Sequence, residues 1–281
     1  MKQDNYKFDV CVIGGAGHIG LPMGVALANK KFSTVLLDLN KDGLAEIQKG
    51  FFPFKEVGGQ VALKKALKIK KLSTSVFPEV IKNSKTIIMV IGTPIDEYFN
   101  PNFNGIFKAL DAYLPYFNDG QTLILRSTVF PGTTERIGRY FKEKGKNIHV
   151  AFCPERIVEG KALIELETLP QLISGLDSEA VQACKDLFGK LTKKKLVVVE
   201  PMEAELAKLF SNTWRYITFA IGNQFYMTAA DHGLNYHNIY KAMVTDYERN
   251  KDLPRPGFAA GPCLLKDTMQ LAAFNNNNFF L

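Results

Sequence analysis

The chain is poor in the residues that metals and disulfides use. Its 281 residues include only four cysteines and four histidines. The cysteines form no CxxC motif and no paired framework, and the histidines have no metal-ligand spacing. We therefore expect no metal site and a reducing, cytoplasmic location. Cys11 falls in an apolar strand pattern and Cys184 in a helical pattern, where each is expected to be buried as a small hydrophobic side chain.

Long hydrophobic runs are also absent. No stretch approaches the roughly 20 apolar residues of a membrane-spanning helix, and the apolar run after the polar residues 1–9 is too short for a signal peptide. We expect no membrane contact. The net charge of +7 favours anionic partners, but no basic segment is interleaved with aromatics, so we expect no nucleic acid. The densest lysine cluster, residues 64–71, lies in a predicted amphipathic helix and is expected to be a solvated face.

Strand patterns alternate with helical patterns through the first two thirds of the chain. This alternation predicts an α/β fold, a Rossmann-like doubly wound parallel sheet that helices cover on both faces. The pattern then changes, because apolar residues recur at helical spacing over residues 202–232 without a proline. We expect an NAD-binding domain over residues 1–200 and a helical central domain over 201–281, with a homodimer formed through the long helix. The predicted strands are Val10–Ile13, Thr34–Asp38, Thr86–Ile91, Thr122–Leu125, Ile148–Phe152 and Leu196–Val199.

A glycine motif follows the first predicted strand. Gly15-Ala16-Gly17-His18-Ile19-Gly20 is a GxGxxG between a strand and a helix, where the glycines allow a tight turn, close approach of a pyrophosphate and close helix packing. Asp38 ends the second strand, where a carboxylate binds ribose hydroxyls and repels a 2′-phosphate, so we expect NAD as the cofactor. The predicted cofactor-binding residues are Gly15, Gly17, His18, Ile19, Gly20, Asp38, Thr93 and Thr128.

A nucleophilic pattern lies near the other end. Cys263 follows a Gly/Pro-rich turn, with Lys266 three residues on and Asp267 four residues on. Since a thiolate attacks and a thiol does not, an ammonium that lowers the thiol pKa makes such a cysteine a nucleophile. A nicotinamide site together with a nucleophilic cysteine indicates oxidation through a covalent sulfur intermediate.

Four further patterns lie in a fixed order after the glycine motif: Ser127-Thr128-Val129, Pro154 to Gly160, Lys208 with Asn212, and Gly261 to Asp267. With that motif they resemble the UDP-glucose/GDP-mannose dehydrogenase family over nearly the whole chain. The resemblance implies that the C6 hydroxymethyl of a UDP-sugar is oxidised to a carboxylate in two NAD-dependent steps. It also implies that Cys263 forms first a thiohemiacetal and then a thioester with the substrate.

The resemblance implies roles for the remaining site residues. Lys208 and Asn212, on one helical face, would hold the substrate oxygen and stabilise the oxyanion. Glu155 would promote thioester hydrolysis, with Glu159 as a second acid near the substrate. Lys266 would either tune the thiolate or contact the substrate. The predicted catalytic residues are Cys263, Lys208, Asn212, Glu155, Asp267 and Thr128, and the predicted substrate-binding residues are Glu159, Lys208 and Lys266.

Three alternatives stay open from the sequence. The Glu155-Arg156 pair and residues 165–170 are similar to members that act on UDP-N-acetyl-hexosamines, whereas Cys-x-x-Lys-Asp is similar to the UDP-glucose type. A single-hydride β-hydroxyacid-type dehydrogenase would share the Lys208/Asn212 helix without needing the cysteine. Family members continue into a second α/β domain that binds UDP, and the apolar end Phe279-Phe280-Leu281 suggests truncation before it. The chain could then be a catalytically incomplete NAD-binding dimerisation fragment.

Overall fold

The computed structural model describes residues 6–92, 104–258 and 263–275. The described residues form two compact units, the first comprising residues 6–92 and 104–206 and the second residues 207–258 and 263–275. The strands are β1 (Phe8–Ile13), β2 (Thr34–Leu37), β3 (Leu72–Ser75), β4 (Ser84–Met89), β5 (Thr122–Leu125), β6 (His149–Phe152), β7 (Gln171–Gly175) and β8 (Leu196–Val198). The α-helices are α1 (Gly20–Asn29), α2 (Lys41–Gln48), α3 (Gly59–Lys68), α4 (Asn104–Tyr113), α5 (Thr133–Glu143), α6 (Ala162–Thr168), α7 (Ser178–Leu191), α8 (Pro201–Asp231), α9 (Tyr236–Val244) and α10 (Cys263–Phe274). Short 3₁₀ turns are η1 (Pro78–Val80), η2 (Leu114–Tyr116) and η3 (Glu248–Asn250).

The first unit is built on one eight-stranded sheet in the order β3-β2-β1-β4-β5-β6-β7-β8. Strands β1 to β6 are parallel, and their order is that of doubly wound dinucleotide-binding folds. Strand β7 is antiparallel to β6 and β8 is parallel to β7, so the last two strands run the opposite way. The predicted Rossmann-like α/β fold is confirmed.

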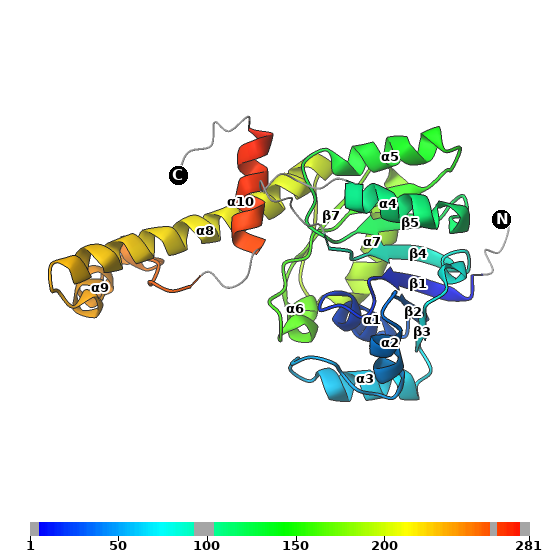
Figure 1. Ribbon diagram of the computed structural model, residues 1–281, viewed down its shortest axis with the longest axis horizontal. Helices are drawn as coiled ribbons and strands as arrows, with labels where there is room; N and C mark the ends of the chain where they lie inside the picture. Colours follow the sequence, from blue (N-terminus) through cyan, green and yellow to red (C-terminus); the bar gives the residue numbers. More distant parts are fainter. Residues whose placement is uncertain (1–5, 93–103, 259–262, 276–281) are drawn as a thin grey trace. The chain divides into compact units, whose positions relative to one another are not determined.

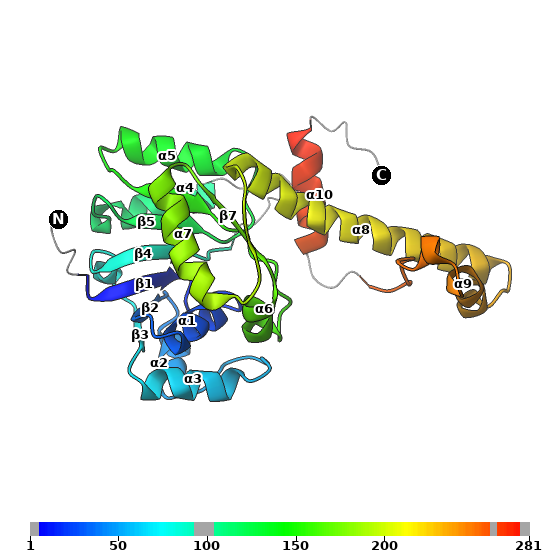
Figure 2. The same cartoon turned by 180° about the vertical axis from the view of Figure 1, so that it is seen from behind.

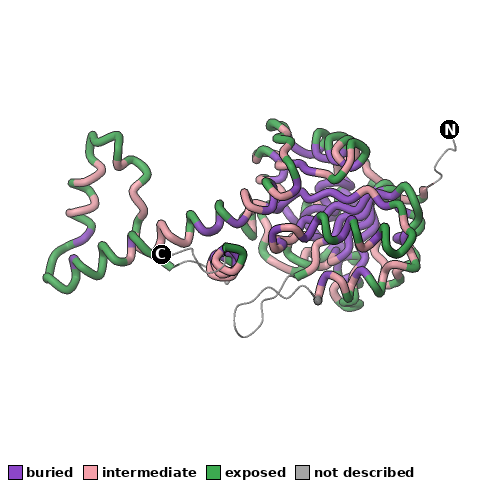
Figure 3. The backbone as a smooth tube through the Cα atoms, turned by 90° about the horizontal axis from the view of Figure 1, so that it is seen from above, coloured by how far each residue is buried: buried purple, intermediate pink, exposed green. Residues whose placement is uncertain are grey.

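Helices cover both faces of this sheet. Helices α4 and α5 lie on one face (Figure 1), while α1 and α7 lie on the other (Figure 2). Along β1, Val10 and Val12 pack into the core beneath α1, and Cys11 and Ile13 pack into the core on the α4 side. A strand buried on both faces reads as a continuous apolar run, which is why these strands could be predicted. Figure 3 shows the buried residues concentrated in this sheet.

The long helix α8 begins inside the first unit. Glu205, in its second turn, is buried and accepts hydrogen bonds from the Gly132 and Thr134 amides at 2.6 and 2.9 Å. The Thr134 hydroxyl donates a third at 2.6 Å. Burial raises the pKa of Glu205, and these hydrogen bonds offset only part of that rise. The carboxylate thus fixes the start of α8 at the N-terminal end of α5.

The second unit is helical. The segment after η3 returns to α8, where Asn223 exchanges hydrogen bonds of 3.0 and 2.8 Å with the backbone of Gly257. Gly222 permits this approach, because a Cβ there would lie 2.9 Å from the Arg255 carbonyl oxygen. Helix α10 begins at Cys263. Of the helices that the structure describes, none is long and apolar enough to cross a membrane.

Candidate functional site

The glycine turn after β1 fits tightly against neighbouring strands. A Cβ on Gly15 would lie 2.6 Å from the Leu36 Cβ, and one on Gly20 would lie 2.1 Å from the Gly14 carbonyl oxygen. Gly14 itself has a φ of +81°, and a Cβ there would lie 2.0 Å from the Val90 carbonyl oxygen. Close backbone packing therefore requires these three glycines, whatever binds nearby.

Gly17 differs from the other glycines of the turn. It is exposed, and an added Cβ would meet only the Gly14 carbonyl oxygen, at 3.4 Å. Packing against the protein therefore gives little reason for a glycine here. At the N-terminus of α1, the N-cap residue Ile19 supplies no side-chain hydrogen bond. An open glycine beside an uncapped helix N-terminus is the arrangement that receives a pyrophosphate, so the turn fits a dinucleotide.

Asp38 follows β2 and is held against the same turn. Its Oδ2 accepts the Ala16 amide at 2.9 Å, and its Oδ1 accepts the Asn40 amide at 3.0 Å. A carboxylate oxygen has more than one acceptor site, so each oxygen can still accept a ribose hydroxyl. His18 is exposed and stacks on Phe54, with ring centroids 4.1 Å apart. Sequence reasoning missed Phe54, which comes from the loop between α2 and α3.

The ends of β4 and β5 complete the carboxyl edge of the parallel strands. The Ser127 hydroxyl donates to the Ile91 carbonyl oxygen at 2.5 Å and so links the two strand ends. Thr128, half-buried, follows at this edge. Thr93 lies outside the described residues. The first-unit residues Gly15, Gly17, Gly20, Asp38, Thr128 and Glu155 all follow carboxyl ends of parallel strands, the edge where such sheets bind ligands.

Glu155, directly after β6, is buried in an ion pair. Its Oε2 accepts from Arg126, at 3.1 Å from Nε and also from Nη2, and its Oε1 accepts the amides of Arg156 and Ile157 at 2.8 and 3.1 Å. Arg126 is 1% exposed and lies 4.8 Å from the centroid of the Phe188 ring. Both carboxylate oxygens are therefore occupied, which suits a positioning role in this conformation.

Arg126 is a residue that sequence reasoning missed. The signal is present, because a charged residue directly follows the apolar run of β5 and would be buried there. Glu159 lies exposed in the turn that ends at Gly160, whose carbonyl oxygen accepts the Val57 amide at 2.9 Å. The two acids of this segment thus differ in environment, and only Glu159 faces solvent.

In the second unit, a buried carboxylate joins α8 to α10. Asp267 is fully buried, and its Oδ2 accepts from the Asn212 side-chain amide at 2.5 Å. Its Oδ1 has no hydrogen bond among the described residues but lies 3.4 Å from the Lys266 Nζ. The structure thus brings together three of the predicted site residues. Cys263 lies four residues before Asp267, and Lys208 four residues before Asn212, so each is one turn away on the same helical face.

Two further polar residues are buried beside this cluster. Thr213 Oγ1 and Gln270 Oε1 are buried atoms with no hydrogen-bond partner among the described residues. Buried polar atoms are normally hydrogen-bonded to the protein or to ordered water. Sequence reasoning missed both, although Thr213 follows Asn212 directly and Gln270 lies one turn beyond Lys266 and Asp267.

The four cysteines separate into three buried thiols and one exposed thiol. Cys263, the predicted nucleophile, is exposed at the first residue of α10. Cys11 and Cys184 are buried, as predicted, and burial raises the pKa of Cys11. Cys184 lies with its Sγ 3.5 Å from that of buried Cys153, and this hydrogen bond together with burial raises the pKa of Cys184. Exposure alone therefore singles out Cys263 for chemistry.

Among the residues that the structure describes, one group of side chains is of the kinds that bind metal ions. His149, Asp177 and Glu179 place ligand atoms within 4.8 Å of one another. His149 Nδ1 already pairs with Asp177 Oδ2 at 3.0 Å, and Asp177 also caps the N-terminus of α7 through the Ala180 amide. The positive end of a helix dipole opposes a cation here. We assign no metal to this group.

Comparison with known families matches most of the chain. The model for the NAD-binding domain of the UDP-glucose/GDP-mannose dehydrogenase family matches residues 8–192. The model for the central domain of the same family matches residues 202–279.

Individual relatives give the same result. A UDP-N-acetyl-D-mannosamine dehydrogenase from Methanococcus vannielii is 29% identical, over 97% of this chain and 63% of its own length. A UDP-glucose 6-dehydrogenase from Rickettsia bellii is 26% identical, over 94% of this chain and 62% of its own. The solved UDP-D-ManNAc dehydrogenase of Pyrococcus horikoshii superposes with a TM-score of 0.88 at 27% identity, covering 96% of this chain and 65% of that one. The chain therefore spans less than two thirds of the length of these relatives.

Proposed function

Because the chain belongs to the UDP-glucose/GDP-mannose dehydrogenase family, we propose that it takes part in the oxidation of a UDP-sugar at C6, from a hydroxymethyl group to a carboxylate. The sugar we propose is N-acetylated, with UDP-N-acetyl-D-mannosamine first. Two observations support this choice: the names of relatives such as that from Methanococcus vannielii, and the segment around Glu155 and residues 165–170.

In the proposed reaction, NAD bound at the glycine turn would supply the hydride acceptor for two successive oxidations. The first removal of a hydride and a proton from the alcohol gives an aldehyde. The thiolate of Cys263 adds to the aldehyde carbon, and the thiohemiacetal loses a second hydride and a proton to become a thioester. Water attacks the thioester, the C–S bond breaks, and the carboxylate leaves while the thiol is restored. One alcohol and one water thus consume two NAD⁺ and yield one carboxylate, two NADH and three protons.

The observation that carries this proposal is the cluster at the α8–α10 interface. An exposed thiol, Cys263, lies one turn from Asp267, which is buried and contacts Asn212 and Lys266. Burying a carboxylate costs free energy that its partners only offset, and such pairs add little net stability, so the cluster is better explained by a role in positioning groups for a ligand. We assign the oxyanion to Lys208 and Asn212, the ordering of water to Thr128 and Asp267, and substrate contact to Glu159 and Lys266. Glu155, held in its ion pair with Arg126, would promote thioester hydrolysis by positioning these groups.

We also propose a homodimer through α8. Large apolar side chains on this helix are exposed, with Trp214 at 66% and Phe210 at 53%. Contiguous exposed apolar side chains are typical of interaction surfaces. The cytoplasmic location stays a prediction from the cysteine pattern.

The test counts NADH formed for each UDP-sugar consumed, with UDP-N-acetyl-D-mannosamine, UDP-N-acetylglucosamine, UDP-N-acetylgalactosamine and UDP-glucose. Two NADH per sugar is the expected result for one of them. Cys263→Ser should abolish carboxylate formation, whereas Cys184→Ala, at a buried thiol, should retain it. One NADH per sugar with an active Cys263→Ser variant would favour the single-hydride alternative. NAD binding without turnover of any sugar would contradict the proposal for this chain.

A further inference from the structure

A cavity of about 440 Å³ lies in the first unit, away from the glycine turn. Four of its lining residues, Lys7, Ser33, Lys71 and Asn83, each come directly before a strand, namely β1, β2, β3 and β4. These strands are parallel neighbours, so the cavity opens at their amino ends. We call it the lysine cavity.

The lysines of this cavity lie far from the proposed NAD site. The cavity runs along β3 to Ser75, whose carbonyl oxygen accepts the Asp38 amide at 3.2 Å, but its lysines lie at the opposite ends of the strands. The glycine turn begins after the carboxyl end of β1, and Lys7 precedes its amino end. Six strand residues at about 3.3 Å each place Lys7 roughly 20 Å from the turn. The Rossmann topology therefore gives these lysines no role in dinucleotide binding.

On this face of β2 and β3, a short turn takes the place of a covering α-helix. The connection from β3 to β4 contains only the short turn η1 instead of an α-helix. In register, Ser73 pairs with Val35 and Ser75 with Leu37, so β3 presents hydroxyls where β2 presents apolar side chains. A polar edge strand does not need a covering helix, and the cavity fills the space that such a helix would occupy.

The charge of the lysine cavity is of one sign. Its lining includes Lys7, Lys70 and Lys71 and contains no aspartate or glutamate. Within the part of the chain that the structure describes, none of the three lysines forms a salt bridge. The Lys7 Nζ lies 5.2 Å from the centroid of the Phe8 ring, which is the only cation–π contact of Lys7 among the described residues. One carboxylate lies next to the lining, because Asp9 accepts the Ser33 amide at 2.6 Å. It does not balance three ammonium groups, so a bound anion would relieve the remaining repulsion.

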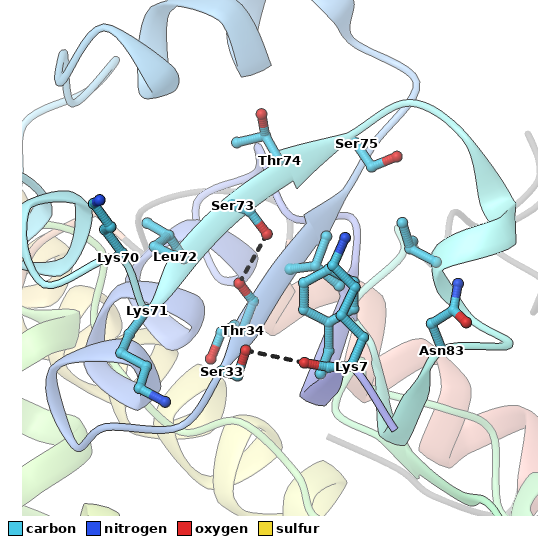
Figure 4. Close-up of a pocket in the computed structure, with 13 residues that line it drawn as sticks. Lys7, Ser33, Thr34, Lys70, Lys71, Leu72, Ser73, Thr74, Ser75 and Asn83 are labelled. Atoms are coloured by element: carbon cyan, nitrogen blue, oxygen red, sulfur yellow. Dashed lines mark hydrogen bonds between the residues drawn. The ribbon is translucent and has the colours of Figure 1, made fainter. Parts of the chain in front are cut away.

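Hydroxyl groups lie between the ammonium groups. Figure 4 shows Ser33 and Ser73 between Lys71 and Lys7, each with its hydroxyl turned to a backbone oxygen. The Ser73 bond, to the Thr34 carbonyl oxygen, is long at 3.4 Å, so this hydroxyl can turn to a better acceptor at little cost. Ammonium and hydroxyl donors together are the groups that bind phosphate oxygens.

We propose that the lysine cavity binds a phosphate-bearing small molecule at the amino edge of the sheet. Its volume falls within the range of roughly 300–1,000 Å³ that small-molecule sites occupy. Lys7, Lys70 and Lys71 supply the charge, and Ser73 supplies a neutral donor. The bound phosphate would bridge β1 and the edge strand β3, which are joined only through β2.

The test measures pyrophosphate binding by calorimetry with NAD at saturation, so that the glycine turn is already filled. We expect one saturable site whose affinity falls with ionic strength. The double variant Lys7→Gln/Lys71→Gln should bind about tenfold more weakly, since two charge-assisted contacts are lost. The matched control Lys65→Gln/Lys68→Gln removes the same charge from exposed positions on α3 and should bind as the unchanged chain does. The NAD affinity should be the same in all three proteins.

The outcomes separate a site from a general charge effect. Equal weakening in both double variants would overturn the proposal, because net charge alone would then explain the binding. Only millimolar, non-saturating binding would mean an adventitious ion only. ADP is the second probe, since saturating NAD blocks the adenosine site of the glycine turn: tighter binding than pyrophosphate would identify a nucleotide ligand, and equal binding a free diphosphate, with both lost in Lys7→Gln/Lys71→Gln. Since NAD binding and turnover are measured separately, failure here leaves the proposed oxidation untouched.

Discussion

The two units of the chain are held together in different ways. The first unit buries apolar side chains on both faces of its sheet, in two large clusters. Beyond Ala207, the buried apolar side chains among the described residues are Leu209, Ala229, Tyr236, Leu264 and Leu271. Polar contacts supply much of the rest, as in the Asn212–Asp267 bond. The first unit therefore has the core of an independent domain. The second unit has a smaller apolar core, depends more on individual polar contacts and leaves apolar surface exposed.

The largest expected effect comes from the buried charge of the first unit. Arg126→Met leaves Glu155 buried without its partner, which should lower the free energy of unfolding by about 3–5 kcal/mol. Urea denaturation measures this. Arg139→Met is the matched control. Arg139 is exposed, and its ion pair with Glu135, at 4.0 Å, should contribute little to stability. If both variants unfold at the same urea concentration, the Arg126–Glu155 pair does not stabilise the first unit.

Two glycines of the glycine turn should affect stability and NAD binding to different extents. Gly20→Ala would place a Cβ 2.1 Å from the Gly14 carbonyl oxygen, so it should cost about 1–3 kcal/mol of stability and also weaken NAD binding. The Cβ added by Gly17→Ala would contact only the Gly14 carbonyl oxygen, at 3.4 Å. The fold should therefore persist while NAD binding weakens. Thermal unfolding and NAD titration of the two variants test this. A Gly17→Ala variant with unchanged NAD affinity would contradict the assigned position of the pyrophosphate.

The base of α8 should show a pH dependence. Burial raises the folded pKa of Glu205 above its ordinary value of 4.5, so the folded state holds the proton more tightly than the unfolded state. That contribution is complete below pH 4.5 and is lost as the pH rises to the folded pKa. The stability of the unchanged chain minus that of Glu205→Gln should therefore fall over this interval and then level off. Urea titrations of both proteins at several pH values measure the difference. A difference that grows with pH would mean that the hydrogen bonds from Gly132 and Thr134 outweigh burial.

Much of the first unit could be predicted because its signals are local. Continuous apolar runs gave six of the strands, and the GxGxxG with Asp38 gave the cofactor turn. The two strands that were missed, β3 and β7, have the sequences LSTS and QLISG. Polar residues and a glycine hide them, and only pairing with neighbours identifies them as strands. β3 is an edge strand, which also explains why its polar side chains are tolerated.

The sequence could name candidate site residues, but it could not predict the contacts that these residues make. Sequence spacing placed Asn212 and Asp267 in their motifs, yet the hydrogen bond between them joins residues 55 apart. Arg126 likewise contacts Glu155 across 29 residues. Such contacts depend on packing between distant elements, which no local pattern encodes. The burial of Glu155 is the consequence that matters most, because it changes the expected freedom of a predicted catalytic acid.

The smallest expected effect on stability concerns two exposed aromatic side chains. The same two variants test the difference between the first and second units most directly. Trp214 in the second unit and Phe77 in the first are exposed to similar degrees, 66% and 69%. Trp214→Ser and Phe77→Ser should each change the unfolding free energy of the monomer, measured at low chain concentration, by no more than about 0.5 kcal/mol, since neither side chain is packed in a core. Sedimentation should separate them: Trp214→Ser should shift the protein from dimer to monomer, while Phe77→Ser should leave the dimer unchanged. Large aromatic side chains carry much of the energy at interfaces, so loss of one at the centre of α8 should be enough. A dimer that survives Trp214→Ser but not Phe77→Ser would show that the interface lies in the first unit. The exposed apolar side chains of α8 would then need another explanation.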